Sequence, residues 1–309
     1  MGAVSAVLWW TVLVVAARSA AGRHTFLDTS SKLAEHDILG APITEEEFKA
    51  SLTLEIIEPA EDPTTKSGHF QGDIILESED QLIQIFEDHP DAQNSATSNE
   101  NNLWPGGVIP YVISSSYNYR ERQVIARAME ELSSETCLTF VPRTFHYDYI
   151  HIYKGYDCSS AVGRNGGRQR LSLGDDCMYV GIVIHELLHA VGFWHEHTRY
   201  DRDDYVYIIE ENIMDNKKHN FYKQSKRSST DLDLPYDYAS IMHYKSTEFA
   251  IGDGPTIVPY SPYFNAFLDV EIGQRRGLSD LDVEGVKQLY KCPVRIVYQP
   301  PRQTGWFWW

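Results

Sequence analysis

HELLHAVGFWHEHTRYDRD, residues 185–203, places three histidines and two glutamates within its first twelve positions, among Leu, Val, Phe and Trp. Polar groups in an apolar setting need partners, so these side chains either pair with one another or hold an ion. Residues 178–192 are predicted to form a mostly apolar helix. On such a helix His185 and His189 project from one face, about 6 Å apart along the axis. That spacing suits two ligands of one zinc ion.

A third histidine lies beyond a glycine. If the helix continued, His195 would face away from His189, but Gly192 can adopt the left-handed conformation that ends a helix. The chain can then turn back and bring His195 to the metal. Three neutral imidazoles and a water form an open, catalytic type of zinc site, and Glu186 lies about 100° around the helix, within reach of that water. The alternative, histidines satisfied within a core, explains one histidine better than three.

The extended stretch resembles the metzincin metallopeptidases and, more narrowly, the astacin family. The resemblance continues through FWHEHTRYDRDDYV (193–206) and returns in SIMHY (240–244), which is similar to the Met-turn of the family. It implies that Met242 forms an apolar floor beneath the zinc site and that Tyr244 is an additional zinc ligand. The expected cofactor is therefore one Zn²⁺ ion per subunit.

The order of the predicted elements favours an α+β domain. Strands are predicted at 106–113, 138–143, 149–154 and 166–174, and further helices at 116–137 and 278–292, the last with Ser279 as N-cap and Asp282 three residues on. The resemblance implies a two-lobed zinc protease with an active-site cleft, a twisted, mainly antiparallel sheet, and the zinc helix at the cleft floor. It also makes residues 166–174 the cleft rim, to which a peptide adds as an extra strand.

All four cysteines lie in the last two thirds of the chain. An even number of cysteines in a secreted protein suggests disulfides, and free buried thiols are the less favoured alternative. Four cysteines allow three pairings, and the residues alone do not choose among them. The astacin resemblance implies Cys137–Cys292 and Cys158–Cys177.

Composition divides the chain into four parts. Residues 1–22 are predicted to be a signal peptide; their apolar run of 15 residues is short of the ~20 that a membrane anchor needs. Residues 23–94 are interpreted as an acidic propeptide, with a net charge of −13 against −5 for residues 95–309. Residues 95–292 form the predicted catalytic domain, and 293–309 a short aromatic tail of unassigned role. We expect a secreted, extracellular protein with no membrane span, and no basic cluster suggests nucleic-acid binding.

The predicted function is peptide-bond hydrolysis in extracellular proteins. The resemblance and the chemistry of zinc together imply a zinc-activated water, with Glu186 as general base and Tyr244 as a hydrogen-bond donor to the developing oxyanion. Two alternatives use the same residues. One is a catalytically inactive zinc-binding or adhesive protein on this fold, and the other is a hydrolase of non-peptide amides or esters.

The acidic segment contains HFQGD (69–73), which resembles the astacin propeptide motif. In that reading the Asp73 carboxylate takes the position of the water on zinc and keeps a zymogen inactive; the alternative is an ordinary Gly-Asp turn. In the family, the new N-terminus, here near Ser95, pairs through water with the residue corresponding to Glu196. No Lys or Arg occurs between residues 66 and 120, so the expected activating protease is not trypsin-like, or the precursor cleaves itself.

Overall fold

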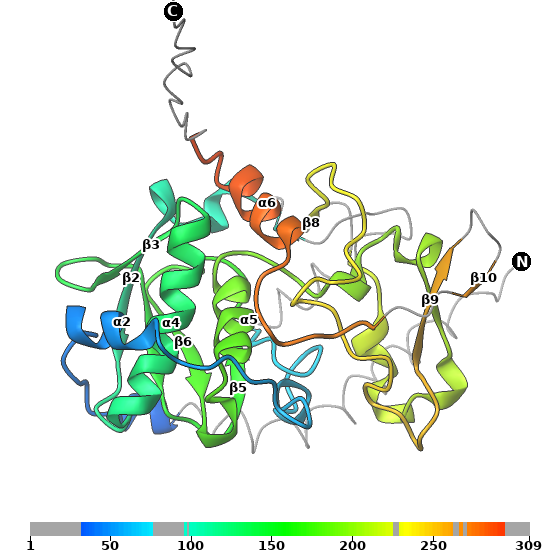
Figure 1. Ribbon diagram of the computed structural model, residues 1–309, viewed down its shortest axis with the longest axis horizontal. Coiled ribbons are helices and arrows are strands. Elements are labelled where there is room, and N and C mark those ends of the chain that lie inside the picture. Colours follow the sequence, from blue (N-terminus) through cyan, green and yellow to red (C-terminus); the bar gives the residue numbers. More distant parts are fainter. Residues whose placement is uncertain are drawn as a thin grey trace, which may run out of the picture.

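The computed structural model describes residues 32–76, 96–97, 99–224, 229–261, 266–267 and 271–293 (Figure 1). The predicted signal peptide, both ends of the predicted propeptide (23–31 and 77–94) and the aromatic tail from residue 294 on lie outside the described residues. Within the described ranges, no helix has both the length and the apolar character needed to cross a membrane. The boundaries predicted at residues 22, 94 and 292 therefore stay predictions.

One half of the domain is built on a five-stranded sheet. Its strands, in spatial order, are β3 (Thr139–Pro142), β2 (Val108–Ile113), β4 (Tyr149–Tyr153), β6 (Arg168–Leu173) and β5 (Cys158–Ser160). The pairs β2–β3, β2–β4 and β4–β6 are parallel, and only β5–β6 is antiparallel. The α+β class is confirmed, but the expectation of a mainly antiparallel sheet is wrong here. The helix that connects β2 to β3 acts as a crossover, which returns the chain in the same direction.

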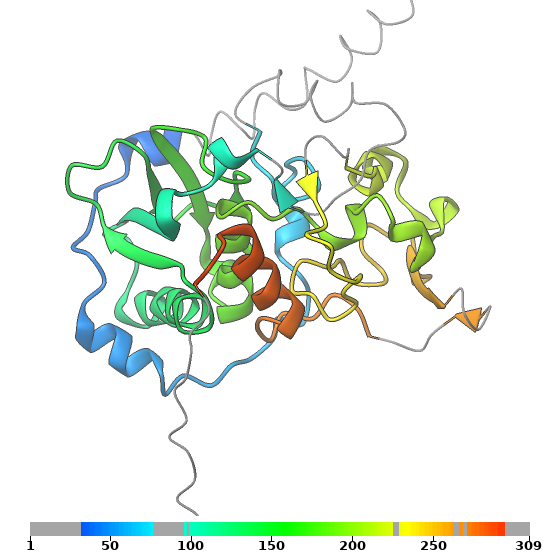
Figure 2. The ribbon, with the colours of Figure 1, turned by 90° about the horizontal axis from the view of Figure 1, so that it is seen from above.

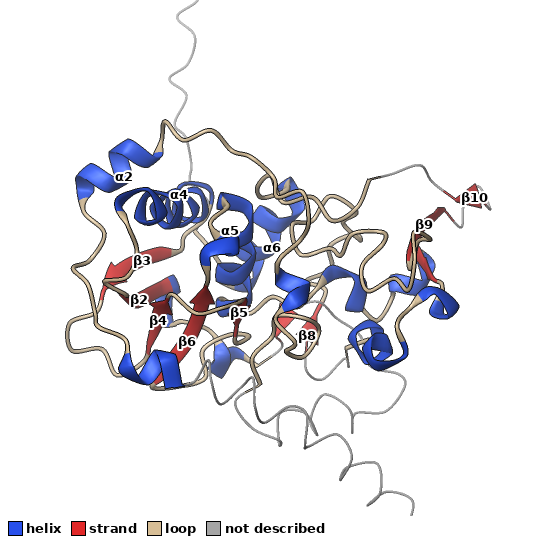
Figure 3. Cartoon of the chain, turned by 90° about the horizontal axis from the view of Figure 1, so that it is seen from below, coloured by secondary structure: helices blue, strands red, loops and turns tan. Residues whose placement is uncertain are grey.

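Two helices cover one face of this sheet (Figure 3). Helix α4 (Tyr119–Glu135) begins at a capping box formed by Asn118 and Glu121, and its apolar positions, including Met129, are buried. Helix α5 (Val180–Ala190) carries the first two predicted zinc ligands and is buried along its whole length. It passes so close to the chain opposite that a Cβ on Gly181 would lie 1.8 Å from the backbone oxygen of Arg275.

The other half of the domain has fewer regular elements and its own apolar cluster around Phe221 and Tyr244. It contains a three-stranded antiparallel sheet of β10 (Ala266–Phe267), β9 (Ile257–Ser261) and β7 (Val206–Ile208), and β1 (Ala96–Thr97) pairs with β8 (Ser229–Thr230). Helix α6 (Asp280–Leu289) then returns to the first half. Its start at Ser279, with Asp282 completing a capping box, confirms the sequence prediction.

Two disulfides tie these elements together. Cys137, just beyond α4, is bonded to Cys292, just beyond α6, and Cys158 in β5 is bonded to Cys177, just before α5. These are the pairs that the family resemblance implies, and the part of the chain described here holds no free cysteine. The second bridge holds the outer strand of the sheet against the start of the zinc helix.

The described part of the predicted propeptide touches the domain in two places, which we call the anchor segment (residues 32–54) and the cleft segment (residues 58–76). The anchor segment contains α2 (Glu45–Ser51), which packs against α4, whereas the cleft segment runs beside α5 (Figure 2). The residues between them include Ile56 and Ile57, whose side chains are exposed. One piece of chain therefore holds the domain at two separate surfaces.

Candidate active site

Four side chains from two distant parts of the sequence meet beside α5. His185, His189 and His195 each direct a ring nitrogen at the carboxylate of Asp73, with Nε2–oxygen distances of 3.1, 3.5 and 3.3 Å. The ligand atoms of all four residues lie within 4.8 Å of one another. All four side chains are completely buried. The three histidines singled out by the sequence thus converge, and the aspartate of the HFQGD motif joins them.

The other nitrogen of each imidazole is held by an oxygen atom. Nδ1 of His185 donates to the backbone oxygen of Ile241 at 2.9 Å, and Nδ1 of His189 donates to that of Phe193 at 2.7 Å. Nδ1 of His195 lies 3.1 Å from the side-chain oxygen of Gln71. Because a proton on Nδ1 leaves the lone pair on Nε2, these contacts set the tautomer in which all three Nε2 atoms can bind a metal.

The buried atoms without hydrogen-bond partners in this four-residue cluster are of the kinds that bind zinc. Nε2 of His189, Nε2 of His195 and Oδ1 of Asp73 are buried and have no hydrogen-bond partner among the described residues, a costly arrangement unless an ion lies between them. Burial lowers the pKa of His185 and lowers that of His195 to about 3, so these rings are neutral near pH 7, as metal ligands must be. Three imidazoles and one carboxylate oxygen are a typical tetrahedral donor set for zinc.

The turn after α5 depends on Gly192. The helix ends at Ala190, and Gly192 has a φ of +117°, outside the range that most residues adopt. A Cβ at this position would lie 2.9 Å from the Cγ2 methyl of Thr97, so both the backbone and the space require glycine. The turn reverses the chain and places His195 opposite His189, with their ring centroids 4.7 Å apart.

Glu186 lies in the same enclosed space with both carboxylate oxygens unpartnered among the described residues. Its side chain is completely buried. Burial, reinforced by the negative charge of Asp73, raises the pKa of Glu186 well above its usual value. A carboxylate without fixed hydrogen bonds, beside a metal site, is free to accept and return a proton.

Tyr244 stands against the third histidine, in ring contact with His195 at 4.8 Å and stacked on His197 at 3.7 Å between centroids. Its hydroxyl donates to the backbone oxygen of Gln71 at 2.5 Å, so in this state it holds the cleft segment. Met242, two residues earlier, is buried, and its backbone oxygen accepts from the amide of Glu196 at 3.0 Å.

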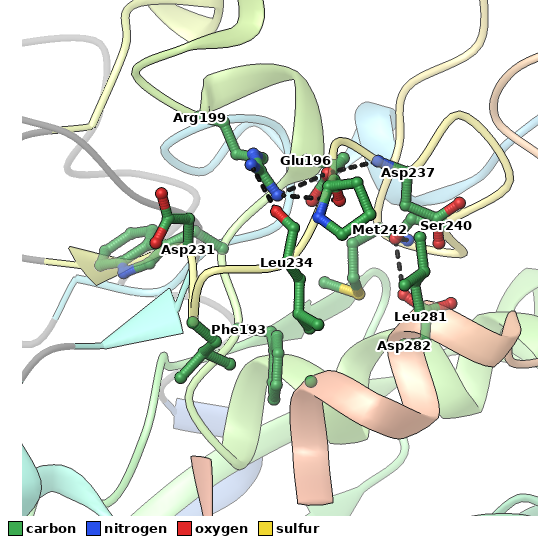
Figure 4. Close-up of a pocket in the computed structure, with 14 residues that line it drawn as sticks. Phe193, Glu196, Arg199, Asp231, Leu234, Asp237, Ser240, Met242, Leu281 and Asp282 are labelled. Carbon is green, nitrogen blue, oxygen red and sulfur yellow. Dashed lines mark hydrogen bonds and ion pairs between the residues drawn. The ribbon is translucent and has the colours of Figure 1, made fainter. Parts of the chain in front are cut away.

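Glu196 faces a separate cavity of about 30 Å³, which is large enough for one or two waters. Figure 4 shows Glu196, Arg199 and Asp237 meeting on one side of this cavity, with Met242 between Leu234 and the helix that carries Asp282. One oxygen of Glu196 accepts from the amide of Asp237 at 2.9 Å and lies 3.3 Å from Arg199. Burial raises the pKa of Glu196 to about 8, although Arg199 opposes this shift.

The cleft segment adds to the edge of the sheet at β5. The amide of Ser160 donates to the backbone oxygen of Asp73 at 3.0 Å, and the amide of Ile75 donates to that of Ser160 at 2.8 Å, in a parallel bridge. The expectation that residues 166–174 are the open rim is therefore wrong, because β6 has β4 on one side and β5 on the other. The three-residue strand β5 has no alternating pattern that sequence analysis could have found.

Three further side chains of the cleft segment were missed by the sequence analysis. Asp62 forms an ion pair with Arg275 at 2.7 Å, and both side chains are 1% exposed. His69 is 2.8 Å from Asp157, again with both side chains buried. Gln71 contacts both His195 and Tyr244, and its φ of +47° is unusual for a residue other than glycine. His69 and Gln71 both lie inside the HFQGD motif, which was the available signal for these two residues.

Comparison with known proteins gives consistent matches. The model of the peptidase family named Astacin matches residues 96–291. Zinc metalloproteinase nas-4 of Caenorhabditis elegans is 39% identical over 239 residues, which are 77% of this chain and 73% of that protein. Zinc metalloproteinase nas-8 of Steinernema carpocapsae is 47% identical over 62% of this chain, which spans only 45% of that protein.

A solved structure shares the fold. High choriolytic enzyme 1, a hatching enzyme zinc-protease from the fish Oryzias latipes, superposes with a TM-score of 0.56 at 43% sequence identity. The match covers 65% of this chain and 96% of the fish protein.

Proposed function

This chain belongs to the astacin family of zinc metalloendopeptidases, and from that premise we propose that it is a secreted peptidase made as a latent precursor. The observation that carries the proposal is the cluster of Asp73 with His185, His189 and His195, in which a residue of the acidic segment closes the zinc site. Substrates are proteins or peptides, as the activity of the family requires.

Each site residue receives a role from its surroundings. The three histidines would hold zinc through Nε2, and the ion would supply the Lewis acidity that brings the pKa of a bound water to about 7. Glu186, with no other hydrogen bond, takes the proton and passes it to the leaving amine. Tyr244, once freed from Gln71, would donate a hydrogen bond from its hydroxyl to the oxyanion that develops on the scissile carbonyl.

Latency follows from what the cleft segment occupies. Asp73 fills the fourth position of the zinc site, where a water would otherwise bind. Backbone hydrogen bonds to Ser160 take the sheet edge at which an extended substrate would lie, and Gln71 engages Tyr244. The inactive state therefore blocks the metal, the peptide-binding edge and the oxyanion donor at once.

Activation would begin with a cut near Ser95. Ala96 is completely buried opposite Phe193, which lines the same cavity as Glu196. After such a cut, the new ammonium group would lie near that cavity and would pair with Glu196 through water. The lack of Lys and Arg between residues 66 and 120 favours a protease of non-tryptic specificity, or self-cleavage.

Secretion is proposed from the apolar N-terminal run and the two disulfides, since disulfides persist in oxidising compartments. The catalytically inactive alternative has no supporting feature, because the three histidines, Glu186 and Tyr244 are all present in the site.

Asp73→Ala tests latency. The purified wild-type precursor should not cleave a short fluorogenic peptide, whereas the variant should cleave it at least tenfold faster than background, in a manner abolished by a chelator. Glu61→Ala is the control, because Glu61 is an exposed carboxylate of the same segment. Complete latency of Asp73→Ala would show that the aspartate is not required for the blockade, which would then rest on the backbone bonds to Ser160 and the contact of Gln71 with Tyr244. An active wild-type precursor would contradict the zymogen itself.

A further inference from the structure

The anchor segment is held by a set of polar contacts with residues that take no part in the zinc site. Nε of Arg122 lies 2.5 Å from the carboxylate of Glu47, and its Nη2 donates to the backbone oxygens of Ala41 and Pro42 at 3.0 and 2.9 Å. One oxygen of Asp37 accepts from the hydroxyl of Ser114 at 2.5 Å, and the other lies 2.9 Å from Nε2 of His151.

Backbone and apolar contacts complete this surface. The amide of Gly40 donates to the oxygen of Ile113 at 2.8 Å, and the amide of Ser115 donates to that of Ile38 at 2.7 Å, so the segment extends β2 at its end. Ile43 is buried in the main core cluster, and its amide donates to the hydroxyl of Tyr111 at 3.3 Å. We call the domain side of this interface, made by Tyr111, Ser114, Arg122 and His151, the anchor surface.

Every hydrogen-bond partner recorded for the Arg122 side chain belongs to the anchor segment. Nε2 of His151 likewise contacts Asp37, and its Nδ1 has no partner among the described residues. Without the segment, the guanidinium and the imidazole would face water, and the hydrogen bonds that they now make to two carboxylates would be lost. Hydrogen bonds to charged groups are stronger than those between neutral groups. The anchor surface is therefore chemically specified for an acidic segment.

A cut near residue 95 leaves all of these contacts in place, because they lie upstream of residue 77, as do those of the cleft segment. Cleavage there only converts an intramolecular contact into a bimolecular one. The severed piece still holds the domain at two surfaces joined by a short connection, and each surface raises the effective concentration of the other. Breaking one peptide bond is then insufficient to expose the zinc site.

We propose that the anchor surface is a peptide-binding site in its own right, and that it retains the anchor segment after the activating cut, so that release of the propeptide is a separate, second step. The inference rests on the proposed function, because it presupposes a precursor that is severed near residue 95. The exposed connection, in which Ile56 and Ile57 are 38% and 53% exposed, is the place where a second cut would uncouple the two surfaces.

The test uses the full-length precursor with a recognition sequence for a site-specific protease placed within residues 91–94. After cutting, the wild-type protein should run on gel filtration with its propeptide still bound and should cleave the fluorogenic peptide only as the fragment leaves. Arg122→Gln should lose the fragment at least tenfold faster, since it removes charge-assisted hydrogen bonds. Arg120→Gln is the matched control, two residues away on the same helix, with an exposed side chain that has no hydrogen-bond partner among the described residues.

A synthetic peptide of residues 32–54 distinguishes retention at the anchor surface from retention by the cleft segment alone. Added in excess to the severed protein, it should compete for the anchor surface and accelerate the rise in peptidase activity, whereas the same peptide with Asp37→Asn and Glu47→Gln should not. Immediate loss of the fragment from the severed wild type, or equal release from the Arg122 and Arg120 variants, would overturn the proposal. Activity in the uncut precursor would instead overturn the proposed latency. The anchor surface would then be tested only by whether the severed fragment stays bound on gel filtration.

Discussion

The anchor segment and the cleft segment belong to one stretch of chain, yet they are held by different kinds of contact. The cleft segment inserts buried charges, including Asp62 and Asp73, into a site whose geometry is set by the catalytic machinery. The anchor segment instead combines a capped helix, strand-like hydrogen bonds and a largely buried pair between Glu47 and Arg122 on the outside of the domain. In the precursor that we propose, the first blocks chemistry and the second supplies attachment.

This difference has an energetic side. Contacts of the cleft segment must disappear when the enzyme works, so their strength opposes activation directly. Contacts of the anchor segment are indifferent to catalysis and can be strong without distorting the zinc site. Because the two segments are linked, binding of the anchor segment raises the effective concentration of the cleft segment at the zinc site. The cleft segment can therefore block the site with few contacts of its own, while the anchor segment supplies most of the affinity.

The largest expected effect comes from a variant that should lose peptidase activity while both segments stay bound. Glu186→Gln keeps the shape of the side chain but removes the proton acceptor, so peptidase activity of the processed enzyme should fall about 10²–10⁴-fold. Zinc content, measured by metal analysis, should stay at one ion per chain, since Glu186 is not a ligand in our assignment. Both segments should remain bound in the precursor, because neither contacts Glu186 by a hydrogen bond.

The same variant has a clear way to fail. Normal turnover by Glu186→Gln at full zinc occupancy would show that another group accepts the proton. Loss of zinc would instead show that the carboxylate contributes to holding the metal.

The next effect should weaken the cleft segment and leave the anchor segment unchanged. Asp62→Asn leaves the guanidinium of Arg275 buried without its charge partner, which typically costs about 3 kcal/mol. Burial opposes ionisation of Asp62, but Arg275 keeps the pKa of this carboxyl below its usual value. The contribution of the pair is therefore present above pH ~4 and is lost as the pH falls through the lowered pKa.

Hydrogen exchange of the precursor measures this asymmetry. Amides of residues 62–76 should exchange faster in Asp62→Asn, while those of α2 keep their wild-type protection. Glu61→Gln is the neighbouring control, because its pair with Lys66 is exposed. Equal loosening of both segments would mean that they behave as one cooperative unit, which would remove the division of tasks.

Residues whose spacing is dictated by chemistry were predictable from the sequence. His185, His189 and Gly192 could be interpreted from helix geometry and zinc coordination alone, and the capping box at Ser279 from the pattern at the start of α6. The disulfide pairing came only through family resemblance. Where the partners are distant and ordinary, as Glu47 and Arg122 are, 75 positions apart, no local pattern connects them.

Two features were predictable but were not predicted. The helix between the strands at 108–113 and 139–142 is a crossover, and a crossover favours parallel neighbours, so the mixed sheet had a signal in the order of elements. Likewise Thr44 and Glu47 have the spacing of a capping box and mark the start of α2. By contrast, the ion pair of Asp62 with Arg275 depends on how the segment enters the cleft, which a single sequence does not specify.

The smallest expected effect weakens only the anchor segment and uses the same capping box. The hydroxyl of Thr44 accepts from the amide of Glu47 at 3.2 Å, and the carboxylate of Glu47 accepts from the amide of Thr44 at 2.7 Å. Thr44→Ala removes the first bond and should destabilise α2 by about 1 kcal/mol, a typical value for an N-cap. Because Glu47 also holds Arg122, fraying at this end should shorten retention of a severed propeptide about fivefold.

The matched control is Glu46→Gln, at an exposed position one residue from Glu47. Within the described part of the chain, the Glu46 side chain has no hydrogen-bond partner. That change should leave retention within twofold of wild type. If Thr44→Ala instead raises the basal activity of the uncut precursor to the level of Asp73→Ala, the anchor segment would be acting on the zinc site itself. Attachment and blockade would then be one function, because a substitution in α2 would open the zinc site before any peptide bond is cut.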